Sequence, residues 1–418
     1  MGIEVAGAAA AVLLIIVVGA VLLLDFMPIA GTWLGRIHIG RHPEEGKWHV
    51  SVARRSLKWL NDTPIAKVTD NTRLTVIDRI KGQYSASALQ DWQQAALLLG
   101  LAEGLEREEQ SAVRAEIDAF LASKFDAGGN WKKAPLHVDS AILAYAVMKV
   151  PGLKIEAYKP AMDNIHKLLL DHVGDDETVR YRKSMSHYRY VDTIGFVCPF
   201  LVAYGMKFGD PSSLELAMKQ IRAYVRFGFH EQTGLPFHAY DARSHSPLGL
   251  VGWGRGLGWF AIGLIDMWDE LPRNHAFRAE LRPIIVSFAK AVLNGQQPHG
   301  AWNWTVTRSE CRADSSATAM LGWYLARAAE IAEIEESAAN GALRSLAFLR
   351  SATRRDGAVD FSQGDTKDIG VYSTQFGLLP FAQGFASRLG QRALRESHDR
   401  GQGQAGSANG KRHEWASP

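Results

Sequence analysis

The sequence predicts an all-α fold, an (α/α)6 barrel of six helical hairpins preceded by one N-terminal transmembrane helix. Three observations support this prediction. Apolar residues recur at helical spacing almost throughout residues 85–390, polar helix starts recur at long and similar intervals, and the N-terminal run is uncharged. Strand-like alternation is scarce. With 418 residues, 47% of them hydrophobic, the chain is long enough to bury a large core.

The first predicted element is the run VAGAAAAVLLIIVVGAVLLL, which carries no charged residue from Val5 to Leu24. A helix of about 20 residues spans the hydrocarbon core of a bilayer, which is roughly 30 Å thick. A cleaved signal peptide is the alternative. Such peptides begin with a basic segment, whereas the only charged side chain ahead of this run is Glu4. We therefore expect residues 1–25 to form a retained, single-pass membrane anchor.

The positive charges near the anchor bear on its orientation. Arg36, Arg41 and Lys47 all follow the apolar run, and no basic residue precedes it. The positive-inside rule then places the main domain in the cytoplasm, although three charges set only a modest bias.

Composition divides the rest of the chain. Residues 26–84 contain turn-rich pieces such as GRHPEEGKW and NDTPIAK, so we expect a juxtamembrane segment and first helices there. Residues 85–395 are predicted to form the helical domain. The Gly-, Ser- and Gln-rich tail, residues 396–418, is predicted to be disordered.

A long-period repeat predicts how the helices are arranged. Small or polar residues precede apolar helices near Ser87, Asp139, Asp192, Trp253–Arg255, Ser315 and Ser373. The gaps are each about 50 to 63 residues, enough for two helices and their loops. An open helical solenoid is the alternative, but its repeats would share a consensus and end in capping units. A closed ring fits better, and it brings the starts of the inner helices together at one mouth.

Charge and cysteine content exclude some classes of function. The net charge of +3 and the absence of a long basic block argue against a nucleic-acid partner. The two cysteines, Cys198 and Cys311, are too few for a disulfide scaffold and do not have metal-ligand spacing. We expect buried free thiols and no metal site. Nothing in the sequence points to a particular protein partner.

Two carboxylates stand at the start of apolar runs. Asp139 follows GGNWKKAPLHV, and Asp192 follows SMSHYRYV, so aromatic and cationic residues crowd both helix starts. Each Asp is interpretable as a helix N-cap. Together they are also interpretable as a catalytic pair, provided that their surroundings separate the two pKa values into an acid and a base.

The next helix starts supply groups suited to sugar recognition. The segment VGWGRGLGW places Trp253, Arg255 and Trp259 between glycines, and it follows GLPFHAYD. Flat aromatic faces stack on sugar rings, and a guanidinium can pair bidentately with the carboxylate of an acidic sugar. Core packing is the competing explanation for any one of the 12 tryptophans.

In this order, these motifs resemble those of the unsaturated glucuronyl and rhamnogalacturonyl hydrolases, glycoside hydrolase families 88 and 105. The resemblance covers about residues 85–390. It rests on five segments: HVDSAILAYAVM, YVDTIGFVCPFLVAYG, TGLPFHAYDARS, VGWGRGLGWFAIGLIDM and ADSSATAMLGWYLARA.

The resemblance implies an (α/α)6 barrel without metal or cofactor that hydrates the C4=C5 bond of a terminal Δ4,5-unsaturated uronic acid. Asp192 would be the general acid/base, and Asp139 would assist it by hydrogen bonding. The implied substrate-binding residues are His238, Trp253, Arg255, Trp259, Ser315 and Ser316. The expected partner is an acidic oligosaccharide. A hydrolase or lyase of a saturated acidic polysaccharide, linked to polysaccharide synthesis or export, and a non-catalytic glycan-binding protein remain the alternatives.

Overall fold

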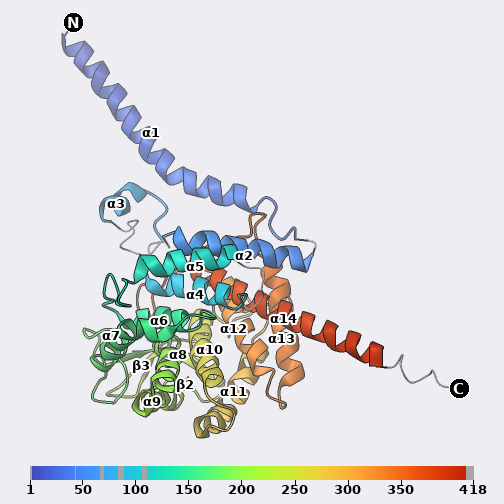
Figure 1. Cartoon of the computed structure of the whole chain (residues 1–418). Coiled ribbons are helices and arrows are strands. Elements are labelled where there is room, and N and C mark those ends of the chain that lie inside the picture. Colours follow the sequence, from blue (N-terminus) through green and yellow to red (C-terminus); the bar gives the residue numbers. More distant parts are fainter. Residues whose placement is uncertain (1, 43, 66–69, 83–88, 106–110, 411–418) are drawn as a thin grey trace, which may run out of the picture.

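Six inner helices form a closed ring in the computed structural model, which describes residues 2–42, 44–65, 70–82, 89–105 and 111–410 (Figure 1). Each inner helix contacts the next one in the chain, and the last contacts the first. The inner helices are α4 (Asp91–Ala102), α6 (Ala141–Met148), α8 (Val191–Phe208), α10 (Gly254–Glu270), α12 (Ser315–Ala328) and α14 (Pro380–Gly410). The (α/α)6 barrel is thereby confirmed, and the open solenoid is excluded.

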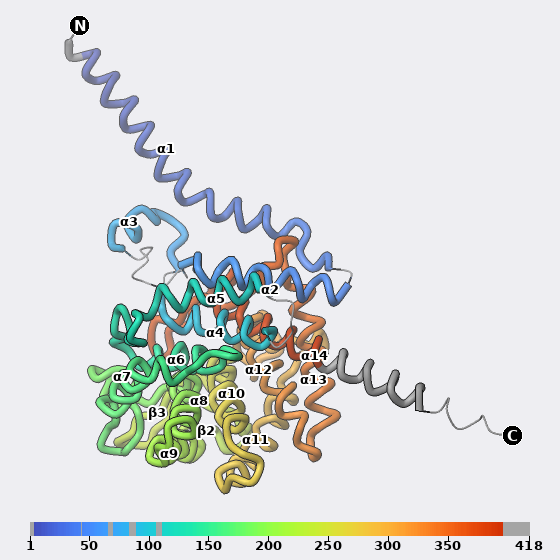
Figure 2. Tube along the Cα trace, in the orientation of Figure 1, coloured from blue at the N-terminus to red at the C-terminus, as the bar shows by residue number. Residues whose placement is uncertain are grey.

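Outer helices cover this ring and run back toward the mouth. Five of them each follow an inner helix in sequence: α5 (Ser111–Lys124), α7 (Lys159–Leu170), α9 (Pro211–Phe227), α11 (Ala276–Asn294) and α13 (Glu335–Ser351). The sixth, α2 (Glu45–Asn61), comes from the start of the chain and packs against α14, α4 and α5 (Figure 2). The ring is therefore completed by a helix upstream of residue 85, the boundary expected from the sequence.

Sequence patterns explain which helices are inner and which are outer. Every residue from Ala141 to Val147 of α6 is buried, because all of its sides contact protein. In α9, by contrast, apolar residues such as Leu214, Ile221 and Tyr224 mark a single buried face. Close packing within the ring needs glycine at some contacts. A Cβ added at Gly384 of α14 would lie only 2.2 Å from the backbone of Ala96 in α4.

Two predicted helix starts, Ser87 and Ser373, do not begin helices in the described part of the chain. Ser87 lies outside the described residues, and α4 begins at Asp91. Ser373 does not begin a helix: α14 starts at Pro380, and the Ser373 hydroxyl instead donates a hydrogen bond to Asp70. The residues expected to form a disordered tail overlap the end of α14, and residues 411–418 lie outside the described chain.

Short strands lie at the mouth of the ring, in segments that show no clear strand pattern in the sequence. All pairings are antiparallel: the central strand β3 pairs with β1, β2 and β4, and β5 pairs with β6. Their bounds are β1 (Tyr188–Tyr190), β2 (Phe229–His230), β3 (Leu235–Asp241), β4 (Pro247–Val251), β5 (Ser362–Gln363) and β6 (Phe376–Gly377). Because β1 leads directly into α8 and β4 leads into α10, this sheet fixes the starts of two inner helices.

Helix α1 (Gly2–Arg36) extends away from the ring (Figure 1). Its stretch Glu4–Arg36 is long and apolar enough to cross a membrane, a property that a signal sequence shares. Helix α8 is also long and apolar enough, but most of it is buried in the barrel. Polar contacts of Asp25 and Arg36 connect α1 to the rest of the chain. Asp25 accepts hydrogen bonds from the backbone of α3 (Thr75–Ile80), and Arg36 binds Asp360.

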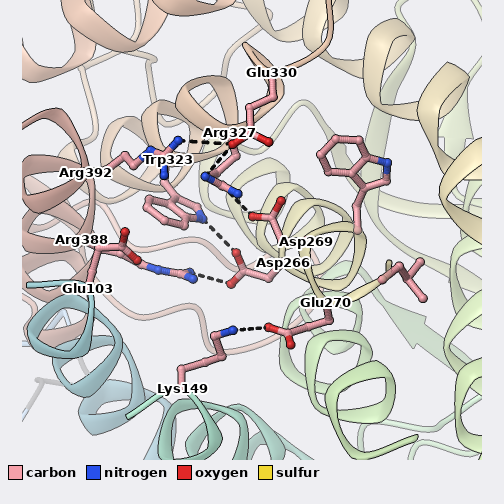
Figure 3. Close-up of polar contacts among 12 residues, drawn as sticks. Glu103, Lys149, Asp266, Asp269, Glu270, Trp323, Arg327, Glu330, Arg388 and Arg392 are labelled. Carbon is pink, nitrogen blue, oxygen red and sulfur yellow. Dashed lines mark hydrogen bonds and ion pairs between the residues drawn. The ribbon is translucent and has the colours of Figure 1, made fainter. Parts of the chain in front are cut away.

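Polar contacts of charged side chains join the inner helices at the end of the ring opposite their starts (Figure 3). Asp266 of α10, which is 1% exposed, accepts hydrogen bonds from Arg388 of α14 at 2.6 Å and from Trp323 of α12 at 2.9 Å. Lys149, just after α6, pairs with Glu270 of α10 at 2.6 Å. These contacts tie four inner helices together, which leaves their N-terminal ends to form the site.

Candidate active site

A cavity of about 130 Å³ opens where the inner helices begin. The starts of α8 and α10, strand β3 and the residues that follow β5 all contribute to its walls. The structure brings together here five of the eight predicted site residues: Asp192, His238, Trp253, Arg255 and Trp259.

Asp192 is the second residue of α8. The N-cap is Tyr190 and no side chain caps this helix, so the capping interpretation of Asp192 is wrong. Among the described residues, Oδ2 of Asp192 has no hydrogen-bond partner, although its side chain is only 18% exposed. Burial raises the pKa of Asp192 to about 7, against the opposing charge of Arg255. A carboxyl group of this kind is protonated in a large fraction of molecules at neutral pH.

His238 lies on β3, beside this carboxyl group. Its Nε2 atom is 3.7 Å from Oδ2 of Asp192, and its Nδ1 atom is 3.0 Å from the hydroxyl of Tyr372. Burial, together with the nearby charge of Arg255, lowers the pKa of His238 to about 4. The imidazole is therefore neutral near pH 7, and it can exchange a hydrogen bond with a sugar hydroxyl.

Arg255, in the first turn of α10, is 2% exposed and is held by the end of β5 and the residue after it. Its Nη2 atom donates to the carbonyl oxygens of Gln363, at 2.6 Å, and Gly364. Its Nη1 atom is 3.6 Å from Oδ1 of Asp365. Its Nε atom is buried without a hydrogen-bond partner among the described residues. Burial raises the pKa of Asp365, although Arg255 opposes the shift.

Aromatic rings form the walls of the cavity. Trp253, the N-cap residue of α10, donates from Nε1 to the side-chain oxygen of Gln363 at 2.9 Å. Trp259 packs against Phe196, with ring centroids 4.5 Å apart, and against the edge of Trp92 at 5.9 Å. These rings are fixed by their neighbours, so they present preformed apolar surfaces to a ligand.

Asp139 lines a second and larger cavity, of about 720 Å³. It lies in a 3₁₀ turn, Val138–Ser140, and no side chain caps that turn or α6, so its capping interpretation is also wrong. Its Oδ2 atom accepts hydrogen bonds from Arg182 at 3.0 Å and from the hydroxyl of Tyr181 at 3.2 Å. Tyr181 also lines the first cavity, which places its side chain between Asp139 and the Asp192 site.

Ser315 and Ser316 are not at the cavity, contrary to the prediction. Both are fully buried at the start of α12, where Asp314 is the N-cap residue. The hydroxyl of Ser316 donates to Asp314 at 2.8 Å, and Asp314 also accepts the backbone N–H of Gln363 at 3.0 Å. Asp314 thus connects the start of α12 to β5, whereas Oγ of Ser315 has no hydrogen-bond partner among the described residues.

The chain matches the model of a known protein family over most of its length. The model of Glycosyl Hydrolase Family 88 matches residues 64–373. The chain belongs to glycoside hydrolase family 88. It is therefore a glycoside hydrolase, and its match begins upstream of the predicted domain boundary at residue 85.

Solved structures share the fold of this family 88 enzyme at low identity. A possible member of glycoside hydrolase family 105 from Klebsiella pneumoniae is 17% identical, with 85% of this chain and 96% of that chain covered and a TM-score of 0.68. An unsaturated glucuronyl hydrolase from Bacillus sp. GL1 is 16% identical, with 84% and 97% covered and a TM-score of 0.60. The enzyme thus has the fold of the unsaturated glucuronyl hydrolases.

A curated relative has a higher sequence identity to this chain than these structures do, but the alignment covers a smaller part of the chain. Protein Atu3128 of Agrobacterium fabrum is 30% identical over 155 residues, which are 35% of this chain. The aligned part of the family 88 enzyme spans 66% of that relative's length, just under two thirds. The 24.9 kDa protein in the picA locus of Rhizobium radiobacter matches to the same extent.

One side of the cavity is formed by residues that were not predicted from the sequence. Asp365, Lys367 and Asp368 line it, and the hydroxyl of Tyr372 contacts both His238 and the backbone N–H of Leu250. The signal was the charged string GDTKD, which precedes the last inner helix just as the recognised motifs precede theirs.

Across the described residues of the family 88 enzyme, no group of three or more His, Cys, Asp or Glu side chains is placed to hold a metal ion. Cys198 and Cys311 are both free thiols, and burial raises the pKa of Cys198.

Proposed function

We propose that this family 88 enzyme releases a terminal Δ4,5-unsaturated uronic acid from an acidic oligosaccharide by hydrating its C4=C5 bond. One observation carries the proposal: the carboxyl group of Asp192 faces an aromatic-walled cavity, lacks a hydrogen-bond partner at Oδ2 among the described residues, and has a pKa of about 7. A group with this pKa can give up a proton and take one back near neutral pH.

The proposed reaction uses Asp192 twice. Its protonated carboxyl gives a proton to C4, which leaves the positive charge at C5 shared with the ring oxygen. A water molecule then bonds to C5 and returns a proton to the carboxylate. The hemiketal at C5 opens to a ketone, and the hemiacetal left at C1 expels the leaving sugar as an alcohol. One water is consumed, and Asp192 ends in the protonation state in which it began.

Surrounding groups would bind the uronyl ring. Trp253 and Trp259 offer apolar faces, and neutral His238 offers a hydrogen bond beside Asp192. Arg255 supplies the positive charge for the uronate. Asp365 lies beside Nη1 of Arg255. Because the pKa of Asp365 is raised, its neutral form is favoured when the carboxylate of the uronate binds next to it.

Asp139 is proposed to act through Tyr181 rather than on the sugar directly. Its two hydrogen bonds, from Tyr181 and Arg182, orient a ring that lines the Asp192 cavity. Asp139 is in this respect a positioning residue.

A second candidate is hydrolysis of a saturated acidic polysaccharide. One observation favours it: Asp365 and Asp368 line the cavity together with Asp192, and hydrolysis of a saturated glycosidic bond ordinarily uses two carboxyl groups. The two candidates differ in the substrate that disappears and in whether Asp365→Asn abolishes turnover.

The experiment uses the full chain in detergent micelles and a panel of unsaturated di- and oligosaccharides. Loss of the ultraviolet absorbance of the conjugated double bond reports hydration. We expect turnover with at least one substrate and a decrease of about 10²–10⁴-fold in Asp192→Asn, the range that general acid–base groups contribute. Turnover of saturated but not unsaturated saccharides by the folded protein would replace this proposal with the second candidate.

We further propose that α1 anchors the enzyme in a membrane and that the catalytic domain begins at α2, near residue 45. The packing of α2 on α14 and α4 supports that boundary. The basic residues that follow the apolar run support a cytoplasmic position for the domain.

A further inference from the structure

Four cations surround the second cavity, beside Asp139. They are Lys124 at the end of α5, Lys132 and Lys133 in the following loop, and Arg182, and together we call them the basic shelf. The cavity has a volume of about 720 Å³, larger than the one that holds Asp192.

The carboxylates of this cavity do not neutralise the basic shelf. Asp139 pairs with Arg182 at 3.0 Å, and Asp91 lies 3.7 Å from Lys124. Across the described residues, neither Lys132 nor Lys133 forms an ion pair with a carboxylate within 4.0 Å. The pKa of Asp126, which does not line the cavity, is lowered first by its hydrogen bond from the backbone of Asn130 and last by the charge of Lys132.

The positions of these cations differ. Lys132 is exposed, and its Nζ atom donates to the carbonyl oxygen of Ala122 at 2.7 Å. Lys133 is also exposed and close enough to Lys124 to lower the pKa of that buried amine, after the larger effect of burial. Two ammonium groups therefore remain available to an anion at the rim of the cavity.

Apolar side chains share the wall with the basic shelf. Trp131 is held in place because its Nε1 atom donates to the carbonyl of Ala161 at 2.9 Å and its ring packs 4.4 Å from that of Phe125. Leu136 is 73% exposed at the rim. An aromatic face with cations beside it suits a sugar ring that carries an anionic substituent.

The second cavity adjoins the Asp192 cavity. Gln90 lines both cavities, and the ring of Tyr181 lines the first while its hydroxyl binds Asp139 in the second. A saccharide with its terminal uronyl ring beside Asp192 therefore has the second cavity as a neighbouring space for the sugars on its leaving-group side.

We propose that the basic shelf binds the carboxylate or sulfate of a leaving-group sugar, and so selects oligosaccharides that are acidic beyond their terminal residue. The direction of the saccharide rests on the proposed function, whereas the anion site rests on the cations alone. Lys132 and Lys133 are the specificity-determining residues, because neither forms an ion pair with a carboxylate within 4.0 Å in the described chain.

The test compares unsaturated oligosaccharides that match except for the leaving-group sugar: neutral, carboxylated or sulfated. In the Lys132→Gln/Lys133→Gln variant of the full chain, the ratio of kcat/KM for acidic over neutral substrates should fall about tenfold or more, as expected for losing contacts to a charged group. The loss should appear in KM and should shrink at high salt. Comparing the carboxylated and sulfated substrates identifies the anion.

The matched control is Lys154→Gln, an exposed lysine outside both cavities, which should leave the ratio unchanged. A ratio in the double variant equal to that of the parent would overturn the proposal. An equal loss on neutral and acidic substrates, with a lower melting temperature, would also overturn it, because it would indicate a structural role.

Calorimetric binding separates this proposal from the proposed function. Saturated carboxylated and sulfated oligosaccharides are titrated into the parent chain and the double lysine variant. Charge-dependent binding without turnover of any unsaturated substrate would leave the basic shelf standing and overturn the hydration reaction. Turnover of unsaturated substrates with unchanged binding in the double variant would support the hydration reaction and overturn the proposed anion site.

Discussion

Asp192 and Asp365 share one cavity, and under the proposed reaction the titration of Asp192 makes the activity depend on pH. In that reaction Asp192 must be protonated to give its proton to C4, and its pKa is about 7. Activity should therefore fall as the pH rises above 7, because the carboxylate has no proton to give. The negative charge of Asp365 contributes to the raised pKa of Asp192, after burial.

Asp365→Asn should accordingly move the basic limb of the pH profile to lower pH. Removing a neighbouring carboxylate lowers the pKa of Asp192, so its carboxyl loses the proton earlier. The measurement is kcat/KM against pH for both proteins, with Asp368→Asn as a matched control from the exposed side of the same cavity. A limb that stays in place, or moves upward, would show that Asp192 is not the titrating acid.

Residues were predictable where they stood beside a recognisable helix start. Asp192, Trp253, Arg255 and Trp259 all lie at or next to such a start, and the barrel brings those starts together. Asp365 follows a two-residue strand with no periodicity to mark it, so its place opposite Arg255 depended on tertiary structure.

Helix ends opposite the site hold the barrel together through buried charge. Asp266 is the shared acceptor of Arg388 and Trp323, and burial raises its pKa while Arg388 opposes that shift (Figure 3). Removing one partner of such a pair leaves the other charge buried and uncompensated. These contacts connect α10, α12 and α14 at a distance of several helical turns from Asp192.

Arg388→Met should lower the free energy of unfolding by about 3–5 kcal/mol, the cost of breaking a buried ion pair. Urea unfolding of the full chain in micelles measures it. The double variant Asp266→Asn/Arg388→Met should recover part of the loss, because neither charge then remains unpaired. A single variant as stable as the parent would contradict a structural role for this pair.

The inner helices could be predicted from the sequence more readily than the strands. Inner helices such as α8 and α10 carry long apolar runs, which the sequence shows directly. The strands at the mouth are two to seven residues long, too short for a period of two to be distinguished from a loop. Ser315 and Ser316 were implied as site residues by the resemblance of ADSSATAMLGWYLARA, but both are fully buried at the start of α12.

At the scale of the whole molecule, the two ends of the chain close the barrel. Helix α2 lies on α14, so the sixth hairpin is formed by segments more than 300 residues apart, as the hydrogen bond from Gln383 to the carbonyl of Val52 illustrates. The sequence predicted six units, but it could not show that the first outer helix precedes the first inner one. That pairing is set by tertiary packing rather than by local pattern.

The C-terminal end of α1 contacts the barrel. The part of α1 that stabilises the fold is therefore distinct from the apolar part that would anchor the chain in a membrane. Asp360 is 0% exposed and binds both Arg36, at 2.8 Å, and Arg354, at 2.6 Å. These partners keep the pKa of Asp360 low despite its burial. A chain that begins near residue 30 should therefore stay in solution without detergent while it retains Arg36 and the stability of the ring.

A chain that begins at residue 38 lacks Arg36 and should be less stable than the residue-30 chain by about 1–3 kcal/mol, the cost of leaving a buried acceptor with one partner fewer. Thermal unfolding of the two chains measures the difference, and Arg36→Ala in the residue-30 chain is the matched control, because it removes the guanidinium while keeping the chain length. If the control is as stable as its parent but the shorter chain is not, backbone contacts of residues 30–37, and not the ion pair, carry the stability. If the residue-30 chain still needs detergent, exposed apolar surface outside residues 1–29 must hold the enzyme at the membrane.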